Sequence, residues 1–203
     1  MTDPSNNEIT PMAISRRTAV MMITAVATVF LILPACALGL QPALMEQGSV
    51  LWSLFILGPT LLLLTWYDLT EYRLPNLLTI PLIAAGFAFA WNSSEHDLIL
   101  SVLGAIVGYG LVFGLQQLYL RFRGQEGIGL GDGKLLAAGG AWLGILGLGP
   151  ILLLSSVLGM AFFGVTAFFN ANSLEKKQYF PFGPFLAVSI WALSWPPFSQ
   201  LVF

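Results

Sequence analysis

Long apolar runs separated by short polar segments dominate this sequence and restrict the folds open to it. The runs cover residues 18–40, 50–67, 77–91, 98–120, 133–148, 150–170 and 183–203. Most approach the ~20 residues that an α-helix needs to cross a bilayer. The 203 residues are 57% hydrophobic and only 9% charged, whereas about a quarter of the residues in a soluble domain are charged. The sequence therefore predicts an all-α fold, a polytopic membrane bundle of six to seven transmembrane helices.

Run 77–91 is short for a full span, so it either crosses a locally thin bilayer or forms part of a cavity wall. Run 18–40 is longer than the apolar core of a secretory signal, although Ala35-Cys36-Ala37 resembles a cleavage site. We therefore expect run 18–40 to be the first membrane helix. Trp91 and Trp195 are expected at the membrane interfaces.

The basic residues predict the orientation of the helices. All eight Lys and Arg residues fall on one side of a seven-span arrangement, whose opposite loops lie around 41–48, 92–97 and 147–149. Loops rich in Lys and Arg are retained in the cytoplasm. We therefore expect a cytoplasmic tail over residues 1–17, a membrane-embedded domain over residues 18–203, and a carboxyl terminus outside.

The counts of charged and metal-binding residues exclude several classes of protein. A net charge of -2 gives no sign of nucleic-acid binding. The chain has one cysteine, Cys36, and one histidine, His96. A single cysteine excludes a disulfide framework and a cysteine-based zinc ribbon within this sequence. We therefore expect no metal site and no cofactor.

Two aspartates stand where apolar runs meet polar segments, and a carboxylate there needs a physical reason. Asp68 closes the run 50–67, and Asp132 lies between glycines immediately before the run 133–148. Taken singly, Asp68 would be an interfacial charge beside Arg73. Asp132 would be the N-cap of a helix that starts at Gly133. The predicted orientation, however, places both aspartates at the cytoplasmic face.

Taken together, the two carboxylates can do chemistry that neither does alone. When two carboxylates are close in a low-dielectric site they hold one proton between them. The ionised member can take a proton from water while the protonated member polarises a peptide carbonyl. This is aspartic proteolysis. The alternative is a small proton-coupled transporter or channel component using the same acids, although a transporter should place them nearer the bilayer midplane.

Three short segments narrow these choices. Asp68 is followed by Leu74-Pro75-Asn76, and Glu126-Gly127 precedes Gly129-Leu130-Gly131-Asp132 and Lys134. A third segment, Tyr179 to Ala187, contains Pro181, Gly183 and Pro184. In this order the segments resemble the signatures of the prepilin peptidase family, the type IV prepilin leader peptidases among the GxGD membrane aspartyl proteases. The resemblance covers roughly residues 50–190.

The resemblance implies an aspartic-type endopeptidase with Asp68 and Asp132 as its catalytic residues. Its substrates would be type IV prepilins or type II secretion pseudopilins, which lose a short basic leader at the cytoplasmic face of the bacterial inner (plasma) membrane. Its partners would be these substrates and the lipid bilayer, with no nucleic acid. Residues expected to support the site or bind substrate are Leu74, Pro75, Asn76, Glu126, Gly127, Gly129, Gly131, Lys134, Pro181, Gly183 and Pro184.

Longer members of that family carry a zinc-binding CxxC region in the cytoplasm and also methylate the new amino terminus. With a single cysteine this sequence is expected to be a short form without that region, and methylation is not expected. Two interpretations of the second segment stay open. Lys134 either tunes Asp132 electrostatically or extends toward the lipid headgroups. The alternating glycines at 127, 129, 131 and 133 either form a flexible loop or let a substrate strand approach the backbone.

Overall fold

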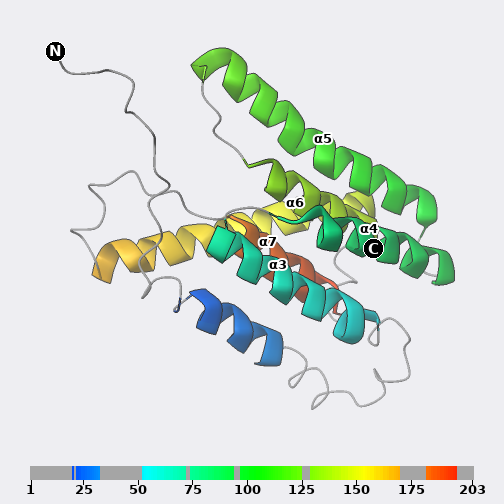
Figure 1. The fold of residues 1–203 in the computed structure, drawn as a ribbon, viewed down its shortest axis with the longest axis horizontal. Coiled ribbons are helices and arrows are strands. Elements are labelled where there is room, and N and C mark those ends of the chain that lie inside the picture. The colour runs from blue at the N-terminus through cyan, green and yellow to red at the C-terminus, as the bar shows by residue number, and fades with distance from the viewer. Residues whose placement is uncertain are drawn as a thin grey trace.

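The structure is a computed structural model that describes residues 20, 22–32, 52–71, 74–93, 97–124, 129–169 and 182–195. Within these ranges the regular structure is helical and contains no strand. The elements are a short helix Met22–Ile32, the π-helical turn η2 (Ser53–Leu57), α3 (Gly58–Glu71), α4 (Asn76–Asn92), α5 (Leu98–Arg123), α6 (Leu130–Phe169) and α7 (Gly183–Leu193) (Figure 1).

Three of the described segments are long and apolar enough to cross a membrane: Ser53–Glu71, Leu98–Arg123 and Leu130–Thr166. The other helices, Met22–Ile32, Asn76–Asn92 and Gly183–Leu193, are apolar but shorter. The prediction of an all-α membrane protein is confirmed. The number of spans and the side on which the amino terminus lies stay predictions.

Helix α6 consists of two helices that meet at Gly144. This glycine has φ 68° and ψ -179°, which is not a helical conformation. A Cβ atom placed on Gly139 would lie 2.9 Å from Cδ1 of Ile151. Twelve residues of continuous helix would instead rise ~18 Å. The chain therefore folds back at Gly144, so that residues 130–143 form a first half of α6 and residues 145–169 a second half.

The turn predicted around residues 147–149 is wrong in its position. Residues 147–149 are helical, and Pro150 also lies inside the helix, near the start of the second half of α6. The reversal takes place at Gly144 because a positive φ is accessible to glycine at low energetic cost. A proline close to a helix start does not need to mark the boundary itself.

Glycines bring the backbones of α5 and the first half of α6 together. A Cβ atom on Gly104 would lie 2.5 Å from the carbonyl oxygen of Gly140 and 2.7 Å from the carbonyl carbon of Gly144. One turn along α5, a Cβ atom on Gly108 would lie 2.8 Å from the carbonyl oxygen of Leu136. Such close approach of small residues is a main way in which membrane helices associate.

We expect Gly104→Ala to destabilise the protein by about 1–3 kcal/mol, the range for overpacking a well-packed interface. The added methyl group meets backbone atoms, which move only if the two helices separate. Thermal unfolding of the purified protein in detergent measures the effect. Gly114→Ala is the matched control, because a Cβ atom at Gly114 meets nothing within 4 Å. Equal melting temperatures for the two variants would contradict this packing.

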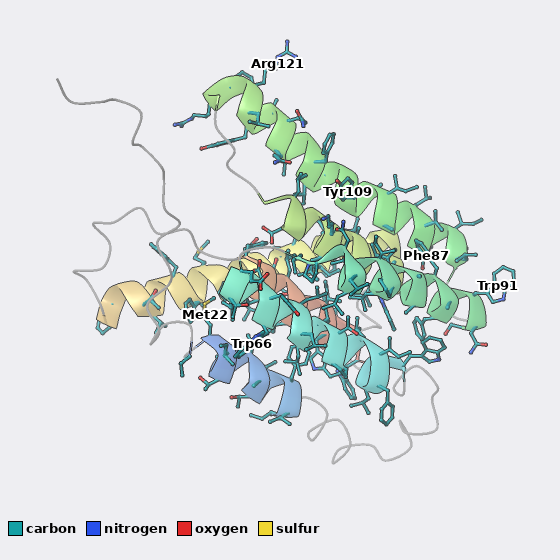
Figure 2. All side chains as sticks on the ribbon, in the orientation of Figure 1. Met22, Trp66, Phe87, Trp91, Tyr109 and Arg121 are labelled. Carbon is teal, nitrogen blue, oxygen red and sulfur yellow. The ribbon has the colours of Figure 1, made fainter. Side chains whose placement is uncertain are left out.

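Helix α7 lies at the centre of the bundle, and aromatic rings surround it. Trp191 of α7 stacks on Phe30 with ring centroids 4.9 Å apart, and Trp195 meets Trp191 edge-on at 5.4 Å. Trp195 is only 1% exposed. The expectation that Trp195 lies at a membrane interface is therefore wrong, because the ring is part of the core. Trp91, at the end of α4, is 78% exposed and points away from the bundle (Figure 2).

Candidate active site

Asp68 lies in the last turn of α3, against the beginning of α7. Its side chain is only 8% exposed. A Cβ atom on Gly183 would lie 2.9 Å from the Asp68 carboxyl carbon, and the Gly183 backbone amide faces the carboxylate as a hydrogen-bond donor. Pro184 follows within the first turn of α7, where proline fits the helix start. The first and third sequence segments therefore meet at Asp68.

One oxygen of the Asp68 carboxylate has no polar partner within the described part of the chain. Its Oδ2 atom is buried and has no hydrogen-bond partner among the described residues. Buried polar atoms are nearly always satisfied, and an exception asks for a functional explanation. An oxygen in this position is available to a water molecule or a polar group of a substrate.

Asp132 lies in the first turn of α6, close to Asp68. Its backbone N–H donates a hydrogen bond to the carbonyl oxygen of Gly129 at 3.1 Å. The helix begins at Leu130, so the expectation of an N-cap for a helix starting at Gly133 is wrong. The side chain of Asp132 is half-buried and lies within electrostatic range of Asp68. Residues 64 positions apart thus bring two carboxylates to one place.

The Leu-Pro-Asn segment packs directly onto the start of α6. A Cβ atom on Gly131 would lie 3.0 Å from Cδ1 of Leu74, so only glycine leaves room for this leucine. Pro75 has an extended backbone, and its carbonyl oxygen accepts hydrogen bonds from two N–H groups of the first turn of α4. Leu74 therefore reaches α6 from a fixed turn.

Lys134 joins the same two segments through a hydrogen bond. Its ammonium group donates to Oδ1 of Asn76 at 2.6 Å. The sequence left two roles open for this lysine, tuning Asp132 or reaching the lipid headgroups. The structure shows a further interaction, with the side chain of Asn76 at the start of α4. The bond ties α4 to α6 two residues beyond Asp132.

Two glycines of the second segment, Gly131 and Gly133, have packing partners in other elements. Gly131 faces Leu74, and a Cβ atom on Gly133 would lie 3.2 Å from Cβ of Val112 in α5. Both glycines belong to the first turn of α6 and not to an extended loop. These contacts favour a packing role at the two positions. Other predicted site residues, Glu126, Gly127 and Pro181, lie outside the described residues, as do Arg73 and His96.

Gln116, a buried polar residue on α5, is not among the residues that the sequence predicted for the site. It is 6% exposed, and its Oε1 atom has no hydrogen-bond partner within the described part of the chain. Along the antiparallel pair, Gly108 meets Leu136 and Val112 meets Gly133. The next turn of α5 therefore brings Gln116 level with Gly129. An isolated polar residue on the glycine-lined face of an apolar run was the signal that could have indicated it.

Comparisons with known proteins agree with the first two segments, around Asp68 and Asp132. Residues 55–164, more than half of the chain, match the model of the Type IV leader peptidase family. The prepilin leader peptidase/N-methyltransferase of Aeromonas hydrophila is 43% identical over 136 residues, which are 66% of this chain and 46% of the relative. The proteins of the same name from Neisseria gonorrhoeae and Xanthomonas campestris pv. campestris are 37% and 35% identical. These matches cover 70% and 72% of this chain, and 49% and 48% of the relatives.

The chain spans about half the length of the curated relatives it matches. No solved structure matches it. The family match includes α3, α4, α5 and most of α6, and therefore includes Asp68, Asp132 and the contacts between their segments. This chain belongs to the Type IV leader peptidase family.

Proposed function

We propose that this chain is an aspartic endopeptidase that removes the leader of type IV prepilins or of type II secretion pseudopilins. The observation that supports the proposal is that the segments carrying Asp68 and Asp132 pack together: Leu74, six residues after Asp68, lies against Gly131, the residue before Asp132. Two carboxylates that share one proton are the machinery of aspartic proteolysis. Their place at the helix ends disfavours a transporter, which needs charges near the midplane.

In this proposal Asp68 is the ionised member of the pair. The amino-terminal end of α7 faces it, and a helix N-terminus favours negative charge. Asp68 takes a proton from a water molecule, and the resulting hydroxide attacks the carbonyl carbon of the scissile peptide bond. Asp132 gives its proton to the carbonyl oxygen. The C–N bond then breaks: the leaving nitrogen takes up the proton that Asp68 received, and one hydroxyl group of the gem-diol returns a proton to Asp132, which leaves a carboxylic acid and restores the pair.

In this proposal the supporting residues fix the positions of the helices that carry the two carboxylates. Leu74, Pro75 and Asn76 fix the position of α4 against the start of α6, while Gly183 and Pro184 fix α7 against Asp68. Gly129 and Gly131 allow the tight start of α6 at Asp132. We assign Glu126, Gly127 and Pro181 to the same site from their place in the motifs. Chemistry of this kind requires no metal and no cofactor.

Cleavage of a prepilin by the purified chain in proteoliposomes tests the proposal. Mass spectrometry should find a released leader and a mature chain that begins directly after it. Addition of a metal chelator should leave the rate unchanged, because no step uses a metal ion. An intact prepilin after prolonged incubation with well-folded protein would contradict the proposal.

We propose that the site faces the cytoplasm of a bacterial inner membrane. Arg121 and Arg123 end α5 at the same end of the bundle as Lys134, and Arg121 points away from the bundle there (Figure 2). A reporter fused after Lys177 should therefore report cytoplasm, and one fused after Phe203 the outside. The reverse result at both positions would contradict the proposed orientation.

The bond between Lys134 and Asn76 predicts an unequal response to two substitutions at residue 76. Asn76→Asp keeps an acceptor oxygen for the ammonium group, so cleavage should stay within about threefold of wild type. Asn76→Leu leaves that group without its acceptor, and a lost bond to a charged group costs about 1.5–3 kcal/mol. Initial rates of leader release should then fall by about tenfold or more. Equal rates for the two variants would show that the bond does not support the site.

A further inference from the structure

Helix α5 carries a second pair of glycines that no described element covers. Gly104 and Gly108 meet the backbone of α6, but a Cβ atom on Gly110 or Gly114 would meet nothing within 4 Å. Both pairs have the four-residue spacing that lets one membrane helix approach another closely. The first pair shows what this spacing does when it has a partner, and the second faces open space.

Gly110 is also part of the wall of a groove. The groove has a volume of about 660 Å³ and lies between α4, α5 and the first half of α6. Apolar residues line most of its length, among them Ile83 of α4, Ile106 of α5 and Ala137 of α6. On α4 its lining extends from Asn76 to Ile83, a rise of ~10 Å or about two helical turns.

One end of the groove is polar, and this end belongs to the candidate active site. Asn76 and Lys134, joined by their hydrogen bond, form part of the lining. Lys134 follows Asp132 by two residues in the first turns of α6. The groove is therefore continuous with the site, and an occupant with one end at Lys134 has that end beside the two carboxylates.

The groove is open on the side that faces the lipid, between α4 and α5. Ile80 and Ile106, which line it from α4 and α5, are more than half exposed on the surface of the bundle. Figure 1 shows α4 and α5 close together at the end of α4 and the beginning of α5 and diverging toward their other ends. A membrane segment can thus enter sideways without leaving the bilayer.

We propose that this groove binds an apolar helix of the substrate, with the scissile bond at the polar end. The proposal rests on the proposed function and adds the surface that selects the substrate. A helix is the occupant that the geometry favours, because Gly110 has no side chain and lets the backbone of another helix come close. The end of a peptide at Lys134 would also lie beside the catalytic residues, as a substrate of a peptidase must. A lipid chain has no need of such a position.

Filling the groove should weaken cleavage of a substrate that carries the helix and should leave cleavage of a peptide without the helix unchanged. Gly110→Leu places a large side chain into the groove. Gly164→Leu is the matched control, since residue 164 is equally open but lies on the second half of α6 and is not part of the lining. The assay compares kcat/KM for a membrane-inserted prepilin with kcat/KM for a short soluble peptide spanning the leader junction. Gly110→Leu should lower the ratio of the two values by about tenfold or more, while Gly164→Leu should keep it.

Cross-linking gives a readout that does not depend on activity. With Cys36 replaced by serine and Asp132 by asparagine, Ile106→Cys should cross-link to prepilin cysteines spaced three or four residues apart in its helix. Val157→Cys, exposed on the second half of α6, is the control and should give no such pattern.

The outcomes separate this inference from the proposed function. If wild-type protein cleaves the prepilin but Gly110→Leu keeps the ratio and Ile106→Cys shows no periodic cross-linking, the groove does not bind the substrate helix. Cross-links between Ile106→Cys residues of two copies of the chain would also overturn the inference, because the groove would then be an interface between copies. If wild-type protein cleaves neither substrate, the proposed function itself is wrong, whereas periodic cross-linking would still support the groove.

Discussion

Asparagine at position 68 or 132 is expected to reduce leader cleavage on the order of 10²–10⁴-fold, the range that general acid–base catalysis contributes. The substitution keeps the shape of the side chain and removes the ionisable group. Asp68→Asn removes the base that activates water, and Asp132→Asn removes the acid that protonates the carbonyl oxygen. The double variant should be hardly slower than either single one, because residues that act as a unit are strongly non-additive.

Asp97→Asn is the matched control for this experiment. The Asp97 side chain caps α5 by accepting a hydrogen bond from the Ile99 N–H at 2.8 Å, and asparagine caps a helix equally well. Its activity should equal that of wild type. Immunoblots of membranes should find all variants at similar levels. Leader cleavage by Asp132→Asn near the wild-type rate would exclude the aspartic mechanism.

The same pair predicts a bell-shaped dependence of rate on pH. At low pH both carboxyl groups carry protons and no base is left to activate water. At high pH both are ionised and no acid is left to protonate the carbonyl oxygen. The two apparent pKa values of the profile belong to the pair and not to either residue. A profile that rises to a plateau without falling would indicate a single titrating group.

The second large effect is expected from Gly183→Ala. A Cβ atom at this position meets the carboxylate of Asp68 and would lie 2.9 Å from its carboxyl carbon. The short aspartate side chain must then turn away from the amino terminus of α7. A displacement of about 1 Å in a catalytic group can cost about 100-fold in rate, which corresponds to about 2.7 kcal/mol. We therefore expect about this loss in kcat for leader release.

Gly159→Ala is the control for a methyl group added beside α7. A Cβ atom there would lie 3.7 Å from the ring of Phe185, an ordinary van der Waals distance. This variant should cleave prepilin at a rate close to that of wild type. Melting temperatures of the two variants should be similar, because an aspartate side chain yields more easily than backbone. A fully active Gly183→Ala protein would show that Asp68 does not need this contact.

The sequence by itself determined that this is a helical membrane protein and which residues deserve attention. Burial in lipid is decided segment by segment, because every backbone polar group must be satisfied within its own helix. Apolar runs therefore indicate helices without knowledge of their neighbours. Asp68, Asp132 and the three motifs were visible for a related reason, since charged groups, prolines and glycines are conspicuous in apolar sequence.

Only the tertiary structure decided how these segments meet. The contacts of Gly131 with Leu74, of Lys134 with Asn76 and of Gly183 with Asp68 join residues 57 or more positions apart. Hydropathy carries no information about such pairs, because they depend on how closely two backbones approach. For the same reason the sequence placed the turn of α6 at residues 147–149 instead of Gly144, and Trp195 at an interface instead of in the core. A glycine or tryptophan has its role set by what packs against it, and that is a property of the fold.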